Sequence, residues 1–240
     1  MVTPIVGAGT DETHWRRWKA VGEWPALTLS GAGVPLVVAP HPDDEILGVA
    51  GLMALLGAAE VIAVTDGEAS HPDSTVYTPK TLAEVRRHET TAALTRLGLG
   101  GTAVYRLGHP DGGIDEAALT AQLIEHLTPT RWCLATWRGD GHPDHEAVGR
   151  AAAVACAATG AVLLEYPIWT WHWAQPGDER VPWKRARRID LPVGVQTAKA
   201  HAIAAFRSQI TALGPAPGDA PVLPPHVLAR FARPYEVVFA

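Results

Sequence analysis

Short apolar runs alternate with segments of helical periodicity through the first two thirds of this sequence. Residues 34–39 are apolar and partly β-branched, which predicts a buried strand, and residues 44–57 spread apolar side chains over a wide helical face. By the same criteria we expect strands at residues 61–65, 102–107, 132–137, 161–165 and 235–239. We expect helices at residues 81–97, 117–127, 146–159 and 196–213. This alternation predicts an α/β fold: a Rossmann-like, doubly wound, mainly parallel sheet with helices on both faces.

The chain is long enough for one large core, because 47% of its 240 residues are hydrophobic. We expect a single domain over residues 1–240. The net charge of -5 argues against a protein that binds duplex nucleic acid. No apolar run approaches the ~20 residues of a membrane span, and residues 1–18 lack the features of a secretory signal. The expected location is therefore the cytoplasm, where Cys133 and Cys156 are expected to be buried thiols.

Two similar motifs rich in histidine and carboxylate residues follow two of the expected strands. HPDDE occupies residues 41–45, directly after the first strand, and HPDHE occupies residues 142–146, just past the fourth. In a doubly wound sheet the first and fourth strands are neighbours where the strand order reverses, and ligands bind outside their carboxyl ends. We therefore expect the two motifs to meet in one crevice.

The motifs contain the donors of a metal site. His41 and Asp44 lie three residues apart at a strand-to-helix turn, and His145 supplies a third ligand from the facing loop. Two histidines and a carboxylate with an open position form a catalytic zinc pattern, so we expect Zn²⁺, although imidazole suits iron as well. The alternative is that these are loop histidines and helix-capping acids. Spacing alone does not decide which histidine of the second motif binds the metal.

The remaining motif residues can carry acid–base chemistry. Asp43 is our candidate general base, the alternative being a helix cap. His142 could hold a tetrahedral oxyanion or protonate a leaving amine. Asp144 is expected to orient His142, as a carboxylate orients an imidazole.

The two motifs resemble the signatures of the PIG-L / LmbE-like family of zinc-dependent N-acetylglucosaminyl deacetylases, and the resemblance covers roughly residues 34–165. It implies zinc on His41, Asp44 and His145, with Asp43 as base and His142 as the electrophilic or acid partner. One branch of the family, that of the mycothiol pathway, has tyrosine where this chain has Asp140. This departure argues against a direct match with that branch.

Two further segments fit the same family. A helix carrying Arg86 and Glu89 ends at a Leu-Gly pair, and a loop ends at Asp111-Gly112. The resemblance implies that Arg86 binds hydroxyl or phosphate groups of the substrate and that Asp111 binds sugar hydroxyls. The alternatives are a surface pair between Arg86 and Glu89 and a plain turn at Asp111-Gly112.

The function that follows is a metal-dependent hydrolase that removes an N-acetyl, or other N-acyl, group from an amino sugar or its conjugate. The alternatives are an amidase of another substrate, such as an S-conjugate, and a carbohydrate-binding protein without activity. We expect a catalytic core at about residues 34–165 and a region that sets specificity at about 166–240. In that region Trp169, Trp171 and Trp173 alternate as on a strand. They could stack on a sugar, fill the core or form the interface of a homo-oligomer.

Overall fold

The computed structural model describes residues 7–31 and 33–240, and within them seven strands form one sheet in the order β3-β2-β1-β4-β5-β7-β6. The strands are β1 (Leu36–Ala39), β2 (Glu60–Ala63), β3 (Ala103–Arg106), β4 (Trp132–Thr136), β5 (Val162–Tyr166), β6 (Ala186–Asp190) and β7 (Tyr235–Phe239). The five strands from β3 to β5 are parallel, whereas β7 pairs antiparallel with both β5 and β6. The prediction of a mainly parallel α/β sheet is confirmed. The sequence reading missed β6, whose two central arginines hide the strand pattern at this edge of the sheet.

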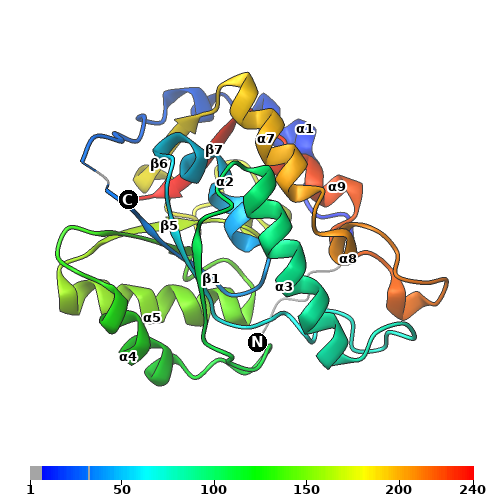
Figure 1. The fold of residues 1–240 in the computed structure, drawn as a ribbon. Coiled ribbons are helices and arrows are strands. Elements are labelled where there is room, and N and C mark those ends of the chain that lie inside the picture. Colours follow the sequence, from blue (N-terminus) through cyan, green and yellow to red (C-terminus); the bar gives the residue numbers. More distant parts are fainter. Residues whose placement is uncertain (1–6, 32) are drawn as a thin grey trace.

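Helices cover both faces of the sheet, as predicted (Figure 1). One face carries α2 (Asp44–Leu56), α3 (Pro79–Arg96) and α7 (Val193–Ile203), and the other carries α4 (Glu116–His126) and α5 (Pro143–Thr159). Shorter helices are α1 (Glu12–Arg17), α6 (Thr170–Trp173), α8 (Arg207–Ile210) and α9 (Pro225–Leu228). Single turns of 3₁₀ helix lie at η1 (Lys19–Glu23), η2 (Trp183–Arg185), η3 (Pro217–Asp219) and η4 (Ala229–Phe231).

Two expectations for the last third of the chain were wrong. The single helix expected over residues 196–213 is two helices, α7 and α8, because the chain turns between them to bury Phe206 in the core. The three tryptophans expected on a strand lie on or next to α6. An alternation this short does not separate a strand from one helical turn, and only Trp171 of the three is buried.

Helix α2 is kinked at Val49, whose φ of −139° and ψ of 17° are not helical. In an unbroken helix the N–H of Gly51 would donate to the carbonyl of Leu47. Here Gly51 donates instead to Glu236 Oε1 at 2.7 Å, while Lys199 Nζ donates to the Leu47 carbonyl at 2.8 Å. The buried Lys199 and Glu236 also pair with each other at 2.6 Å. This ion pair therefore replaces the helical hydrogen bond that the kink removes.

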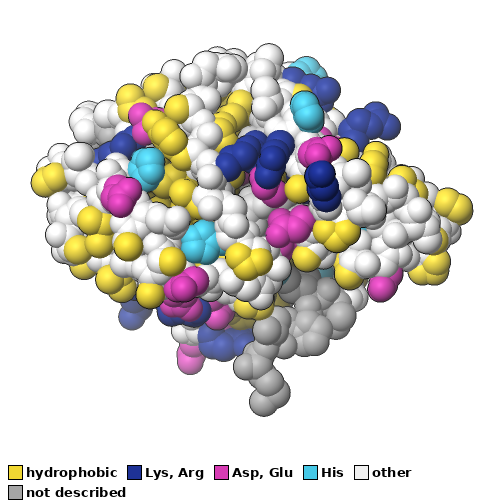
Figure 2. Space-filling model, turned by 60° about the horizontal axis from the view of Figure 1, so that its bottom comes forward, with side chains coloured by type: hydrophobic (Ala, Val, Ile, Leu, Met, Phe, Trp, Pro, Cys, Tyr) yellow, Lys and Arg dark blue, Asp and Glu magenta, His cyan; other side chains and the backbone are white. Residues whose placement is uncertain are grey.

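Three remaining features are the cysteines, the lengths of the helices and the charges on the surface. Cys133 and Cys156 are buried and not disulfide-bonded, as expected. Within the described residues, every helix is too short or too polar to cross a membrane. On the face shown in Figure 2, Lys and Arg side chains are interspersed with Asp and Glu side chains, so neither sign dominates there. The prediction that residues 1–18 lack a secretory signal concerns a segment of which residues 1–6 lie outside the described part.

Candidate active site

The two motifs meet at the carboxyl ends of β1 and β4, which are neighbours in the sheet. His41 lies two residues past the end of β1, Asp44 is the first residue of α2, and His145 lies in the first turn of α5. All three line a cavity of about 430 Å³. The strand order thus brings together segments about a hundred residues apart, as the switch point of a doubly wound sheet predicts.

Three donor atoms converge at one point in this cavity. Asp44 Oδ2 lies 3.2 Å from His41 Nδ1 and 3.3 Å from His145 Nε2. One ligand atom from each residue lies within 4.8 Å of the others. His145 Nε2 is fully buried, and although it lies near Asp44 Oδ2 it makes no hydrogen bond of good geometry to any described residue. Since a buried polar atom normally has a partner, and two imidazoles with a carboxylate suit zinc, this group fits a metal ion.

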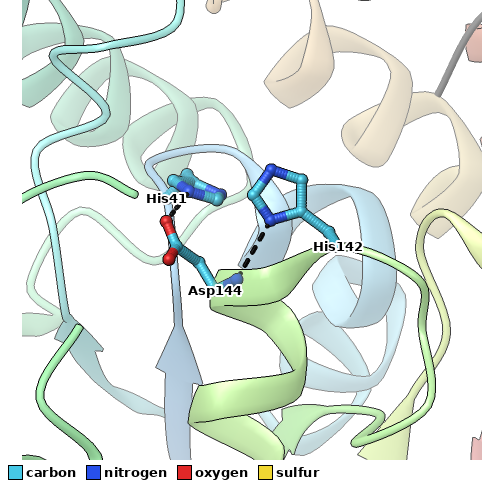
Figure 3. A group of neighbouring side chains, drawn as sticks. All are labelled: His41, His142 and Asp144. Carbon is cyan, nitrogen blue, oxygen red and sulfur yellow. Dashed lines mark hydrogen bonds and ion pairs between the residues drawn. The ribbon is translucent and has the colours of Figure 1, made fainter. Parts of the chain in front are cut away.

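A second group of possible ligands shares His41 with the first. It consists of His41, His142 and Asp144 (Figure 3). Its donors are more fully engaged, because Asp144 Oδ2 already accepts from Gly112 N at 2.8 Å and lies 3.1 Å from His41 Nε2, while His142 Nδ1 accepts from the backbone N–H of Asp144. The first group is therefore the better candidate for the metal.

The position of Asp144 differs from the expectation. Its carboxylate contacts His41 Nε2 and not His142; only its backbone N–H reaches the His142 ring. The reason is that His142 is the N-cap of α5, so its ring turns back over the backbone of the first turn. In a neutral His41 ring this contact favours the hydrogen on Nε2, which leaves Nδ1, beside Asp44 Oδ2, as the nitrogen that can bind a metal.

Asp140 is a residue of this site that sequence reasoning treated only as a departure from a family pattern. Its Oδ2 lies 2.8 Å from His145 Nδ1. The same carboxylate accepts from the backbone N–H groups of Ile168, Trp169 and Thr170 at 2.9 Å. A carboxylate on the outer nitrogen of a ligand histidine fixes the ring's orientation and tautomer. The sequence signal for Asp140 was its place in the loop after β4, next to the second motif.

The electrostatics of the cluster favour a positive charge at the point of convergence. Burial lowers the pKa of His41, but its contacts with Asp111, Asp144 and Asp44 outweigh this effect and raise the pKa well above the usual value. Burial also opposes protonation of His145, yet Asp44 and Asp140 raise its pKa to about 9. The carboxylates around these two histidines therefore stabilise positive charge at this point, and a divalent metal ion would supply such a charge.

Asp43 lies beside this group with a strained backbone. Its φ of 138° is unusual for any residue but glycine, and such a conformation costs roughly 1–3 kcal/mol. Two contacts hold it: its N–H donates to Glu45 Oε2 at 3.1 Å, and its Oδ2 accepts from Arg86 Nη2 at 3.0 Å. Burial raises the pKa of Asp43 to about 7, against the opposing effect of Arg86. Glu45, a motif residue to which the sequence assigned no role, is thus part of the site.

Arg86 is buried and lines the cavity, but its partners are not those expected. Its Nη1 donates to the carbonyl of Gly67 at 2.9 Å and its Nη2 to that of Pro42 at 2.6 Å, in addition to Asp43. The alternative pair with Glu89 was wrong, because Glu89 accepts from Ser208. Gly67 has a φ of +66°, and a Cβ there would lie 1.9 Å from Arg86 Nη1. A side chain at this position would displace the guanidinium.

Asp111 also lines the cavity, on a turn that contains Gly112 at a φ of +82°. Its Oδ2 accepts from Ala69 N at 2.8 Å, and its Oδ1 lies 3.2 Å from His41 Nε2. Although burial raises the pKa of Asp111, the contact with His41 lowers it to about 2. Asp111 therefore lies on a turn and also lines the site. Contact of Arg86 and Asp111 with a substrate stays a prediction.

His142 lines the same cavity. Burial and the neighbouring His145 and His41 lower the pKa of His142 to about 4, so the ring is neutral near pH 7. Because Nδ1 accepts a backbone N–H, the neutral ring carries its hydrogen on Nε2. The neutral His142 ring is therefore a hydrogen-bond donor at Nε2.

Comparison with solved structures shows the fold shared with enzymes of more than one chemistry. The N,N'-diacetylchitobiose deacetylase from Pyrococcus horikoshii has a TM-score of 0.61 at 21% identity, over 83% of this chain and 79% of that one. The antimicrobial reagent A40926 pseudoaglycone deacetylase Dbv21 has a TM-score of 0.60 at 20% identity, over 87% and 96%. The 4-carboxy-2-hydroxymuconate hydratase GalB from Pseudomonas putida KT2440 has 0.55 at 20%, over 73% and 79%. At these identities the likeness establishes the fold alone.

The family comparison is more specific, although no curated protein matches this chain. The model of the PIG-L family, described as GlcNAc-PI de-N-acetylase, matches residues 36–156. That range is half of the chain and contains both motifs, the donors of the candidate metal group and the turn with Asp111. The chain therefore belongs to the PIG-L, or LmbE-like, family of de-N-acetylases.

Proposed function

We propose that this protein is a zinc-dependent hydrolase that removes an N-acetyl, or other N-acyl, group from an amino sugar or its conjugate. The observation that carries the proposal is the convergence of His41 Nδ1, Asp44 Oδ2 and His145 Nε2, the last without a hydrogen-bond partner among the described residues. These three residues would hold the ion. When bound, zinc would polarise the amide carbonyl and make water more acidic.

The chain's own residues divide the proton transfers between them. Asp43 is buried beside the ligands and lines the cavity, so its carboxylate accepts the proton of the attacking water. Arg86 and Glu45 hold that carboxylate and its backbone in place. His142 donates its Nε2–H to the oxyanion that forms on the carbonyl. Asp43, protonated by the water, then delivers that proton to the departing amine, because the pKa of about 4 leaves His142 neutral and argues against the acid role expected for it.

The positioning residues complete the proposed site. Asp144 and Asp140 act through the outer nitrogens of His41 and His145. Residues 34–165 would form the catalytic core and residues 166–240 the region that sets specificity, within one domain over residues 1–240. A cytoplasmic location and assembly into a homo-oligomer also stay proposals.

The experiment combines metal analysis with acetate release from N-acetylated amino sugars and their conjugates. We expect about one zinc per chain, and removal of it by a chelator should abolish turnover. Asp43→Asn should keep the metal and lose roughly 10²–10⁴-fold in kcat, whereas His145→Ala should lose metal and activity together. Asp73→Asn, at an exposed carboxylate outside the cavity, is the matched control. Full turnover by Asp43→Asn would remove the base assignment, and full turnover after removal of the metal would refute the hydrolase proposal.

A further inference from the structure

The cavity that holds the candidate metal group has a second wall of different chemistry. Four apolar side chains line the cavity: Ile168 and Trp169, from the segment after β5, and Val222 and Leu223, from the segment before α9. Leu47 on α2, three residues after Asp44, also lines the cavity, and these five side chains form its apolar wall. None of the five side chains has a group for binding a hydroxyl except the indole N–H of Trp169.

The polar side chains around the cavity are largely engaged with the protein itself. Arg86 uses both terminal nitrogens on backbone carbonyls and Asp43. Each oxygen of Asp111 already contacts a described residue. Gln209 Nε2 donates to the hydroxyls of Ser208 at 2.9 Å and Ser70 at 3.3 Å. A free sugar with several hydroxyl groups would therefore find few uncommitted partners here.

The apolar wall is preformed. The backbone N–H of Trp169 donates to Asp140 Oδ2, which also contacts His145, so the wall and the candidate metal group share one carboxylate. Leu223 N donates to the Gln209 carbonyl at 2.9 Å. Buried Asp219 ties the segment before α9 to the loop before α3, because it accepts from Ser74 Oγ and Thr75 Oγ1 at 2.6 Å each. A rigid surface loses little entropy when a ligand binds.

We propose that the substrate carries an apolar aryl or alkyl group close to the scissile amide, and that Trp169 and Val222 recognise it. This inference rests on the proposed function, since it places the amide at the candidate metal group. The cavity volume of about 430 Å³ lies within the ~300–1,000 Å³ of small-molecule sites. An apolar group seated on this wall leaves water, whereas a hydroxyl-rich one would be dehydrated without compensation.

Two substrate series identify where the apolar group is attached. The first compares p-nitrophenyl and octyl glycosides of N-acetylglucosamine with the free sugar, and the second compares N-octanoylglucosamine with N-acetylglucosamine. Release of the acid is measured for each with the zinc-loaded protein, and binding of each is measured by calorimetry. We expect kcat/KM and affinity at least about tenfold higher for the apolar member of one series. The series that responds shows whether the wall accepts the aglycone or the acyl chain.

The variants test the residues directly. Trp169→Ala should reduce the apolar-to-polar selectivity ratio about tenfold. Val222→Thr keeps the shape of the side chain and adds a hydroxyl, so it should lower the same ratio several-fold if the wall excludes water. Val193→Thr makes the same exchange at a side chain that is 77% exposed and outside the cavity, and it should leave the ratio unchanged. Thermal unfolding confirms that each variant is folded.

The outcomes separate this inference from the proposed function. Deacylation with equal selectivity for polar and apolar substrates, or a ratio unaffected by Trp169→Ala and Val222→Thr, overturns the inference and leaves the hydrolase intact. Preferred binding of apolar glycosides or N-acyl sugars without turnover supports the wall and refutes the hydrolase. Absence of both binding and turnover for every apolar member overturns the inference as well.

Discussion

We expect the buried ion pair of Lys199 and Glu236 to stabilise the fold with α2 in its kinked form. Lys199→Met removes the charge and the donor but retains most of the side-chain volume. Removing one partner of a buried ion pair costs roughly 3–5 kcal/mol, because the other charge remains buried. Glu236 would still accept from Gly51 N at 2.7 Å and Leu52 N at 2.8 Å. These two bonds to a charged acceptor keep the expected loss near the lower limit, about 3 kcal/mol.

Urea and thermal unfolding measure this loss. For a chain of this length, about 3 kcal/mol corresponds to a fall in Tm of roughly 6–12 °C. Lys184→Met is the matched control, since Lys184 is exposed and such surface changes usually stay within about 0.5 kcal/mol. If Lys199→Met unfolds at the same urea concentration and temperature as Lys184→Met, the reasoning about the kink is refuted.

A double variant separates the ion pair from the hydrogen bonds to the helix. Lys199→Met with Glu236→Leu removes both charges, and replacing a buried pair by apolar residues is often neutral. Here, however, the N–H groups of Gly51 and Leu52 would lose their acceptor inside the kink. Each unsatisfied group costs roughly 1–3 kcal/mol, so the double variant should stay destabilised. Recovery of wild-type stability would show that Glu236 matters only as the counter-ion of Lys199.

Three further perturbations test the site. Gly67→Ala should lower kcat at least about tenfold, since its Cβ would displace the guanidinium of Arg86. The control is Gly57→Ala, which is also at positive φ but has no described atom outside its own helix within 4 Å of the new Cβ, so it should lower stability only. Equal kcat for the two variants in the acetate assay would show that Arg86 has no part in turnover. Asp140→Asn should weaken zinc binding about 10–100-fold, as measured by competition with a chelator, and unchanged affinity would contradict the role given to this carboxylate. Saturating zinc at about 100 times its Kd should raise the free energy of unfolding by about 2.7 kcal/mol, and an unchanged Tm would argue against a metal site in the folded state.

The sequence predicted the parts of the fold that local patterns determine. Strand and helix periodicities located all five parallel strands and the four helices from α2 to α5 within a few residues. The rule for switch points then placed residues 41–45 and 142–146 together before any distance was known. These predictions succeeded because burial on a sheet and on a helix follows fixed repeats along the chain.

Side-chain contacts between distant segments could not be read in the same way. The contact of Asp144 with His41 joins residues 103 positions apart, whereas the expectation paired Asp144 with its near neighbour His142. The pairing of Asp140 with His145 is local in sequence, but it depends on where β4 ends and α5 begins. Such contacts depend on side-chain directions at loop ends, and these follow from the tertiary structure and not from spacing.

The backbone of Asp43 links the fold to the proposed chemistry. A φ of 138° costs roughly 1–3 kcal/mol, and a residue with no task beyond capping α2 would relax to an ordinary conformation, since its side chain makes no capping hydrogen bond. Instead, two buried residues hold it, Glu45 through the backbone N–H and Arg86 through the carboxylate. The conformation turns the Asp43 side chain to Arg86 while Asp44, the next residue, faces the two histidines. The strained turn thus points adjacent carboxylates to different partners, as the proposed roles of ligand and base require.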